Sequence, residues 1–246
     1  MNANEILFRC SSLGHIMTES RSKSDPLSET CKGHLSDVFI SKKYGRRTDI
    51  VSRYMTKGTM VEEDSLTLYS RVKKKFYVKN EEHFTNEYIS GTPDIILVDG
   101  AMPTEIIDIK SAWDIHSFFR AKAKELNKMY YWQLMGYMAL TGATLGRIAY
   151  CLVNTPESLQ DGERKSLWYK MGQPAGDNNE WIEACQELDR SMIYDDIPIA
   201  ERVYDLFTVE RDESAIQAIY KRVEQCRNWM NTELFTTPER IDVEGV

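Results

Sequence analysis

Two apolar runs separated by a short turn constrain the fold of this chain more than any other feature. Residues 91–100 read GTPDIILVDG and residues 104–110 read TEIIDIK, and both runs are rich in β-branched residues. The intervening Asp99-Gly100 pair is typical of a turn between paired strands. Beyond Lys110, apolar residues recur at helical spacing over residues 115–126 and 130–140. Strands followed directly by helices predict an α/β fold in which helices cover a sheet.

The remaining pattern extends this interpretation to a central mixed sheet with helices on both faces. Residues 20–34 are rich in serine and predict a loop. Thr141-Gly142 predicts the end of a helix. Further helices are expected from about Gly58 to Tyr69 and over 181–190 and 212–230, strands over 147–153 and 202–209, and a hairpin from 76–79 and 85–90.

Length and composition indicate an ordinary globular protein. The chain has 246 residues, of which 42% are hydrophobic and 28% charged, so it can bury a core without disulfides or a structural metal. We expect one domain over residues 1–246, with a core at about 58–153 and acidic strand and helix elements at 177–235. No apolar run approaches a bilayer span and no export signal is evident, which predicts a cytoplasmic protein without a membrane partner.

The charge is unevenly distributed. The net charge is −7, but residues 1–150 carry +3 and residues 151–246 carry −10. Basic residues of the first part cluster at Lys42–Arg47, Arg71–Lys75 and Arg120–Lys128. Such clusters either form a local footprint for phosphates or are ordinary solvated faces. The five cysteines have no C-x-x-C spacing, which predicts reduced, buried thiols and neither a zinc site nor an iron–sulfur cluster.

Candidate catalytic residues lie on the two apolar runs. Asp94 follows Pro93 at the start of the first strand, and Asp108 and Lys110 lie on the second. Because side chains alternate along a strand, Asp108 and Lys110 point to the same face. If the strands pair through the turn at Asp99-Gly100, Asp94 comes close to Asp108.

Two neighbouring carboxylates repel each other unless a proton or a cation lies between them. Mg²⁺ or Mn²⁺ would remove the conflict, because these ions prefer oxygen ligands. The plainer alternative is that Asp94 caps a turn while Asp108 and Lys110 form a surface ion pair.

Residues on both sides of the strands favour the metal interpretation. Glu62, followed by Glu63 and Asp64, lies in the first turn of a predicted helix, from which a carboxylate could reach the metal. Downstream, Gln133 and Tyr137 are four residues apart and share one face of a helix. The amide of Gln133 is flanked by apolar residues and needs hydrogen-bond partners if it is buried.

These motifs occur in a characteristic order: G-x-x-x-E at Gly58 and Glu62, P-D at Asp94, D-x-K at Asp108 and Lys110, and Q-x-x-x-Y at Gln133 and Tyr137. In this order the sequence resembles the PD-(D/E)XK nuclease superfamily, in particular the RecB-type branch that includes lambda-type phage exonucleases. The match covers residues 58–137, and weaker similarity extends to both ends of the chain. The resemblance implies a restriction-endonuclease-like core.

The resemblance also implies roles for individual residues. Asp94, Asp108 and Glu62 would be metal ligands, joined by the backbone carbonyl of Ile109. Lys110 would activate water or stabilise charge. Gln133 and Tyr137 would orient the lysine or contact DNA. The remaining residues implied are Arg9, Ser11 and Ser12, which would hold a terminal phosphate unless they form an ordinary strand and turn. The strand carboxylate is Asp108 where relatives more often have Glu, and Glu63 stays open as an alternative ligand to Glu62.

The expected function is therefore Mg²⁺-dependent hydrolysis of phosphodiester bonds at the ends of linear duplex DNA, in phage-type recombination or replication. Mn²⁺ is expected to substitute for Mg²⁺. An endonuclease of the same fold and a catalytically silent DNA-binding module are the alternatives. The implied partners are DNA, a single-strand annealing protein and further copies of the chain, and a phage-encoded protein would act in the cytoplasm of its bacterial host.

Overall fold

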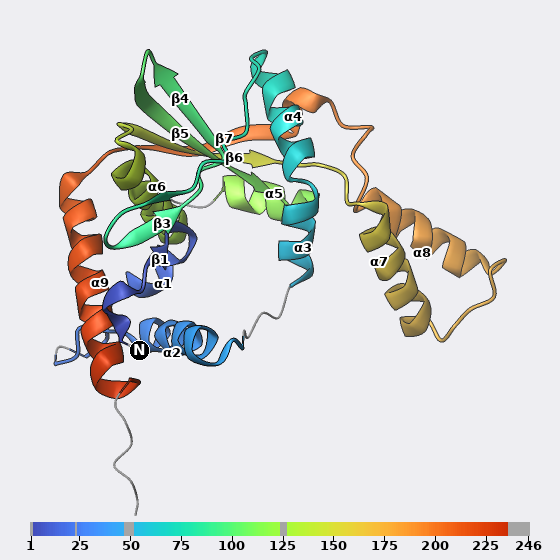
Figure 1. Cartoon of the computed structure of the whole chain (residues 1–246). Helices are drawn as coiled ribbons and strands as arrows, with labels where there is room; N and C mark the ends of the chain where they lie inside the picture. The colour runs from blue at the N-terminus through green and yellow to red at the C-terminus, as the bar shows by residue number, and fades with distance from the viewer. Residues whose placement is uncertain (1, 23, 47–51, 124–126, 236–246) are drawn as a thin grey trace, which may run out of the picture.

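A four-stranded mixed sheet forms the centre of the molecule (Figure 1). The computed structural model describes residues 2–22, 24–46, 52–123 and 127–235. The strands lie in the order β4, β5, β6, β7, with antiparallel, parallel and antiparallel pairing in turn. Their bounds are Ile95–Asp99, Met102–Ser111, Leu145–Cys151 and Val203–Glu210. The predicted α/β fold with a mixed sheet is confirmed.

The hairpin of β4 and β5 forms as the sequence predicts. Gly100 in the turn has φ +60°, a left-handed conformation that glycine adopts without strain. Ile95 pairs with Ile107, and the register shifts between Leu97 and Val98 near the turn. The pairing sends Ile95 and Ile107 into one core cluster and Ile106 into another, so both faces of the sheet are buried.

Helices cover both faces of this sheet. Helix α6 packs on the face of Ile106 and Ile148, together with α1, α2 and α9. Helix α4 packs on the face of Ile95 and Ile107. The helices are α1 (Leu13–Ile16), α2 (Glu29–Tyr44), α3 (Arg53–Met60), α4 (Glu62–Lys73), α5 (Ile115–Lys122), α6 (Lys128–Thr141), α7 (Glu157–Lys170), α8 (Asn179–Arg190) and α9 (Glu213–Glu233), with 3-10 turns η1 (Ala3–Glu5), η2 (Cys10–Ser12) and η3 (Ile199–Glu201).

Most predicted helices are confirmed, including the end of α6 at Gly142, which has φ +81°. The predicted helix from Gly58 is instead two helices, because Val61 leaves helical geometry between α3 and α4. The predicted loop over residues 20–34 is wrong after Ser28, whose side chain caps α2. Serine favours helix starts as well as loops. Helix α7 is not among the predicted elements.

A second, three-stranded sheet lies beside the first. Its strands are ordered β1, β3, β2, with bounds Phe8–Arg9, Ile89–Gly91 and Phe84–Thr85. The expected strand at residues 76–79 is wrong. Phe76 is 85% exposed and Val78 is 67% exposed, so this apolar run lies outside any sheet. The hairpin is instead the pair of β2 and β3.

The amino-terminal segment packs closely against α6 and α9. A Cβ atom at Gly136 would lie 2.8 Å from the Cys10 Sγ atom, and one at Gly91 would lie 3.0 Å from it. The Ala3 amide donates a hydrogen bond to the Asn231 side chain at 2.7 Å. The segment therefore depends on two helices that follow it by more than a hundred residues.

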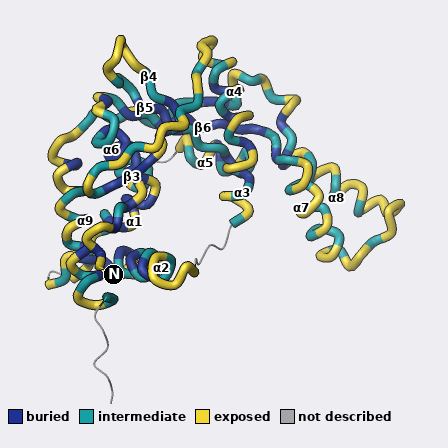
Figure 2. Tube along the Cα trace, in the orientation of Figure 1, coloured by how far each residue is buried: buried dark blue, intermediate teal, exposed yellow. Residues whose placement is uncertain are grey.

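Helices α7 and α8 project from the rest of the molecule as an antiparallel pair (Figure 1). None of the residues in either helix is buried, in contrast to the strands of the sheet (Figure 2). An ion pair between Arg53 and Glu163 connects α7 to α3. Within the described part of the chain, no helix combines the length and apolar character needed to span a membrane.

Candidate active site

The hairpin register brings Asp94 and Asp108 together. Because Ile95 pairs with Ile107, the next residues outward, Asp94 and Asp108, are opposite each other. Residues in this relation have Cβ atoms about 5 Å apart on one face of the sheet. The Asp94 carboxylate accepts a hydrogen bond from the Ile109 amide at 2.6 Å. The two predicted carboxylates are therefore neighbours at the carboxyl end of β5.

Asp108 is buried, with only 2% of its surface exposed. Its Oδ1 atom accepts a hydrogen bond from the Gln133 Nε2 atom at 2.9 Å. Its Oδ2 atom lies 2.6 Å from the Lys110 Nζ atom but accepts no hydrogen bond of ordinary geometry. A buried carboxylate oxygen is costly without full compensation. This burial also excludes the alternative of a surface ion pair on an exposed strand.

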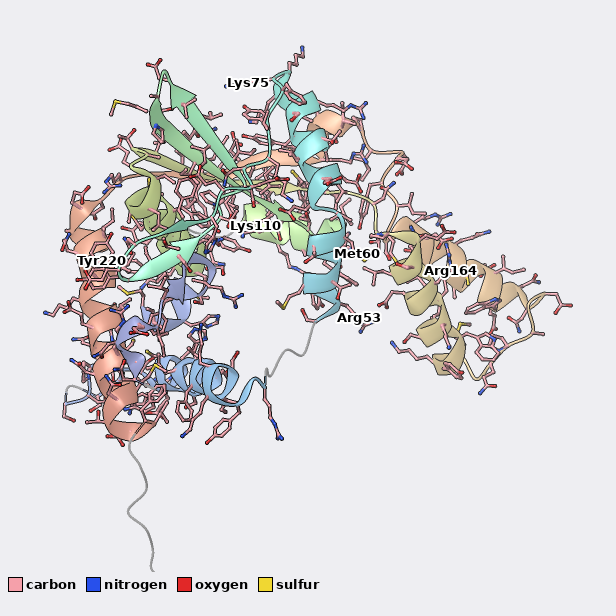
Figure 3. All side chains as sticks on the ribbon, viewed as in Figure 1. Arg53, Met60, Lys75, Lys110, Arg164 and Tyr220 are labelled. Atoms are coloured by element: carbon pink, nitrogen blue, oxygen red, sulfur yellow. The ribbon has the colours of Figure 1, made fainter. Side chains whose placement is uncertain are left out.

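Lys110 lies on the same face of β5 as Asp108, as the alternation predicts. Burial acts to lower the pKa of Lys110, but the charge and hydrogen bonding of Asp108 and the charge of Asp94 together outweigh it and raise the pKa above its ordinary value. The Nζ atom also lies 5.3 Å from the centre of the Tyr130 ring, a cation–π contact. Helix α3, with Arg53 and Met60, passes the end of β5 that carries Lys110 (Figure 3).

The charged form of Asp94 is disfavoured in this arrangement. Burial, followed by the charge of Asp108, raises the pKa of Asp94 from 3.8 to about 7. The hydrogen bond from Ile109 and the charge of Lys110 act in the opposite direction without cancelling the shift. The protein alone therefore does not supply enough positive charge for both carboxylates.

Glu62 lies at the start of α4. Its charge is among those that raise the pKa of Asp94, which indicates that its side chain faces the carboxylate pair. Its Oε1 atom is 3.2 Å from the Lys79 Nζ atom. This contact, together with Asp94, raises the pKa of Lys79. Glu63 and the following Asp64 are exposed. Of the three acidic residues, the structure thus places Glu62 nearest the pair.

These residues fit a divalent cation in part. In the described residues, no group of three or more His, Cys, Asp or Glu side chains is close enough to hold a metal. Two carboxylates are in place, and Glu62 is paired with Lys79 instead. The N–H and C=O of a strand residue point to the same side. The carbonyl of Ile109 therefore faces Asp94, as its amide does. All of these donors are oxygen atoms, which Mg²⁺ prefers.

Gln133 and Tyr137 lie behind the carboxylates. The Gln133 Nε2 atom is 3.0 Å from the Tyr137 hydroxyl as well as 2.9 Å from Asp108. Gln133 therefore contacts Asp108 and not the lysine, which differs from its expected contact. Tyr137 is only 5% exposed, so it is not on the surface, and the DNA contact expected of it stays a prediction.

The amino-terminal residues approach the site from the side of α6. Arg9 pairs with Ser90 across the small sheet, and Ser90 precedes Asp94 by four residues. Arg9 and Ser11 are exposed, whereas Ser12 is buried and donates a hydrogen bond to the Arg9 carbonyl at 2.9 Å. Arg9 and Ser11 are therefore accessible to a ligand, and the contact with a terminal phosphate expected of Arg9, Ser11 and Ser12 stays a prediction.

Two residues near the site are not among the predicted ones. Tyr130 contacts Lys110, and its position three residues before Gln133 places both on one side of α6. Helical spacing could have identified it. Lys79 pairs with Glu62 from a segment without regular structure. No sequence signal marks it.

Solved structures of two exonucleases have a similar fold. The chain is similar to a phage-related exonuclease from Haemophilus somnus 129PT, with 25% identity, a TM-score of 0.70, and coverage of 93% of this chain and 95% of the other. The chain has the fold of the phage-type exonucleases. The resemblance inferred from the motifs is thereby confirmed.

A second similar structure is the alkaline exonuclease LHK-Exo from Laribacter hongkongensis, with 14% identity, a TM-score of 0.61, and coverage of 94% of this chain and 91% of the other. That enzyme has also been solved in complex with dAMP, and this structure matches with 15% identity and a TM-score of 0.59. No protein-family model matches the sequence, and no curated protein does.

Proposed function

We propose that the protein is a metal-dependent deoxyribonuclease that degrades duplex DNA from its ends. The observation that carries this proposal is the buried Asp108, held by Gln133 and Lys110 beside a second carboxylate, Asp94. The similar fold of a phage-related exonuclease supports the same reaction class.

The carboxylates would hold a Mg²⁺ or Mn²⁺ ion. Asp94 and Asp108 would be its ligands, with the Ile109 carbonyl, and Glu62 would join them after leaving Lys79. When bound, the ion would supply positive charge for the phosphate and a nucleophilic water at neutral pH. The raised pKa of Asp94 supports this, because it shows that the charge of Lys110 does not compensate both carboxylates.

Lys110 would act on the phosphate directly. Its ammonium group is charged at neutral pH, since its pKa is raised above an already high value. Next to Asp108 it can stabilise negative charge that develops on the phosphate oxygens during hydrolysis. Gln133 keeps the Asp108 carboxylate oriented through its Oδ1 atom, while the Oδ2 atom faces the Lys110 ammonium group.

The end of the substrate would lie near the amino-terminal turn. The exposed Arg9 and Ser11 are cationic and polar groups suited to a terminal phosphate. A role in phage-type recombination, with an annealing protein as partner and several copies of the chain around the DNA, follows from the same resemblance and belongs to this proposal.

Digestion of linear and closed circular duplex DNA tests the reaction. With Mg²⁺, the linear DNA is expected to be shortened from its ends while the circle stays intact. Cleavage of the circle would identify an endonuclease instead. Binding of DNA without cleavage of either substrate would identify a silent binding module.

Variants of the site test the residue assignment. Asp108→Ala and Lys110→Ala are expected to abolish degradation, and Arg190→Ala on the remote helix α8 serves as the control. If the two site variants degrade DNA as fast as the control, the assignment is wrong.

A further inference from the structure

A cavity of about 570 Å³ lies next to the candidate active site and has no role in the reaction proposed above. It is formed by α5, the start of α6, and strands β6 and β7. Its size falls within the ordinary range for small-molecule sites. The residues that line it are Ser117, Arg120, Ala121, Asn127, Tyr130, Tyr150 and Leu206.

The lining of this cavity favours an anion. It contains a guanidinium group at Arg120, a hydroxyl group at Ser117 and a side-chain amide at Asn127, and none of the described residues that line it is acidic. Arg120 is exposed, and none of the ion pairs among the described residues includes it. A cation without a carboxylate partner beside a polar cavity is suited to a phosphate group.

The cavity also has an aromatic wall. Tyr130 and Tyr150 both line it, and neither hydroxyl group has a hydrogen-bond partner within the described residues. Behind Tyr150, the Phe118 and Tyr204 rings pack at 5.9 and 5.8 Å between ring centres and support it. Aromatic side chains of this kind stack on nucleobases regardless of sequence.

Tyr130 connects the cavity to the candidate active site. The same ring that lines the cavity lies 5.3 Å from the Lys110 Nζ atom. A molecule in the cavity is therefore separated from the catalytic lysine by one side chain.

We propose that this cavity binds a deoxynucleoside 5′-monophosphate, with its phosphate at Arg120 and its base against the tyrosine wall. The ligand class rests on the proposed function, because such a nucleotide is what an exonuclease releases. The site gives the enzyme a place to hold its product beside the catalytic centre, and it makes the nucleotide an inhibitor.

Calorimetric titration of the full chain with dAMP in EDTA tests this, because no metal or DNA is then needed. Wild-type protein is expected to bind dAMP, and Arg120→Gln to weaken the affinity about tenfold or more, since a bond to a charged group is lost. Tyr150→Phe is expected to weaken it about threefold. Arg190→Gln, which removes an exposed cation from the remote helix α8, is the control and leaves the affinity unchanged.

Further titrations test which parts of dAMP are bound and whether dAMP binds at the amino-terminal turn instead. Deoxyadenosine and inorganic phosphate are each expected to bind at least about tenfold more weakly than dAMP, because each lacks one of the two contacts. The inference is overturned if wild-type protein does not bind dAMP at millimolar concentration. It is also overturned if Arg120→Gln binds as wild type while Arg9→Gln loses binding, because dAMP would then lie at the amino-terminal turn.

The titration is independent of the nuclease assay. If dAMP binding depends on Arg120 but no DNA is cleaved, the proposed function fails and the nucleotide site stands. If DNA is cleaved but dAMP binding ignores Arg120 and Tyr150, the nucleotide site fails alone.

Discussion

The central sheet carries two clusters of charged residues, and they differ in how completely the protein neutralises them. The first, the carboxylate pair of Asp94 and Asp108 with Lys110, lies at the carboxyl end of β5. The second, which we call the paired cluster, consists of Glu105, Arg147, Asp205 and Lys73. In it, Arg147 lies 2.6 Å from Glu105 and 2.7 Å from Asp205, and Lys73 lies 2.7 Å from Asp205.

The pKa values of one aspartate in each cluster show the difference. Burial acts to raise the pKa of Asp205, but hydrogen bonds from Lys73 and Arg147 outweigh it and hold the pKa below its ordinary value. At Asp94, burial and the charge of Asp108 prevail, and the pKa rises to about 7. One sheet thus holds a cluster whose charges are balanced within the protein and one in which they are not. Under the proposed function, the paired cluster contributes to the fold and the carboxylate pair to the reaction.

Removing charge from the carboxylate pair is expected to give the largest effect, and on catalysis alone. Asp108→Asn should reduce the rate of duplex degradation by a factor of about 10³, because an electrostatic contact to the reacting centre is lost. The free energy of unfolding should not fall. Rates on end-labelled linear DNA and urea denaturation measure the two quantities. A loss of stability matching the loss of rate would contradict the contrast.

Breaking the paired cluster is expected to have the opposite outcome. Arg147→Met leaves Glu105 and Asp205 without their shared partner and should destabilise the fold by about 2 kcal/mol, less than a fully buried pair because the groups are partly exposed. The rate per folded molecule should stay at the wild-type value at 25 °C. Urea denaturation, with Arg190→Met as the surface control, measures the effect.

Gln133→Ala tests the support of the carboxylate pair. The amide orients Asp108 without facing the substrate, so the rate of degradation should fall about 10- to 100-fold, as is typical when the partner of a metal ligand is removed. The Mg²⁺ concentration that gives half the maximal rate should rise at the same time. An unchanged Mg²⁺ dependence would show that Gln133 only fills the core.

The pH dependence of stability should reveal the unpaired charge of Asp94. Its pKa is higher in the folded protein, about 7, than the ordinary 3.8. The folded state therefore binds the proton more tightly, and the stability present below pH 3.8 is lost as pH rises through about 7.

Asp94→Asn should remove this part of the profile and leave the metal-free variant more stable at pH 8 by about 1 kcal/mol, a value discounted for solvent exposure. Thermal unfolding in EDTA at several pH values measures it. Identical profiles for the variant and wild type would contradict the raised pKa.

The smallest change in stability is expected at the surface ion pair of Arg164 and Asp189, on the projecting α7–α8 arm. Both side chains are about one third exposed. Arg164→Ala should change the free energy of unfolding by no more than about 0.5 kcal/mol and leave degradation unaffected. Urea denaturation and the linear-DNA assay check both, and a larger change would mean that the arm contributes to the core.

The hairpin and the carboxylate pair could be predicted from the sequence because their signals are local. A glycine turn fixes the register of β4 and β5, and strand alternation then places Asp108 and Lys110 on one face. By contrast, α2 buries only Cys31, Leu35 and Phe39, at a spacing of four residues among polar neighbours. From the sequence alone, the pattern of α2 resembles a loop, and the helix is stabilised by its tertiary contacts.

Pairings between distant segments could not be predicted. The contact of Glu62 with Lys79 depends on the path of a segment without regular structure. Phe76 and Val78 have the residue types of a strand, yet none of the strands that the structure describes pairs with them. Residue type favours a strand only where tertiary structure provides a partner.

The attachment of the amino terminus to α9 has a consequence for how the protein is made. Ala3 bonds to Asn231, which follows it by 228 residues. During synthesis the first residues leave the ribosome long before that partner exists. The amino-terminal segment can therefore make this contact only after α9 has been synthesised, and a truncation that removes Asn231 is expected to loosen the segment.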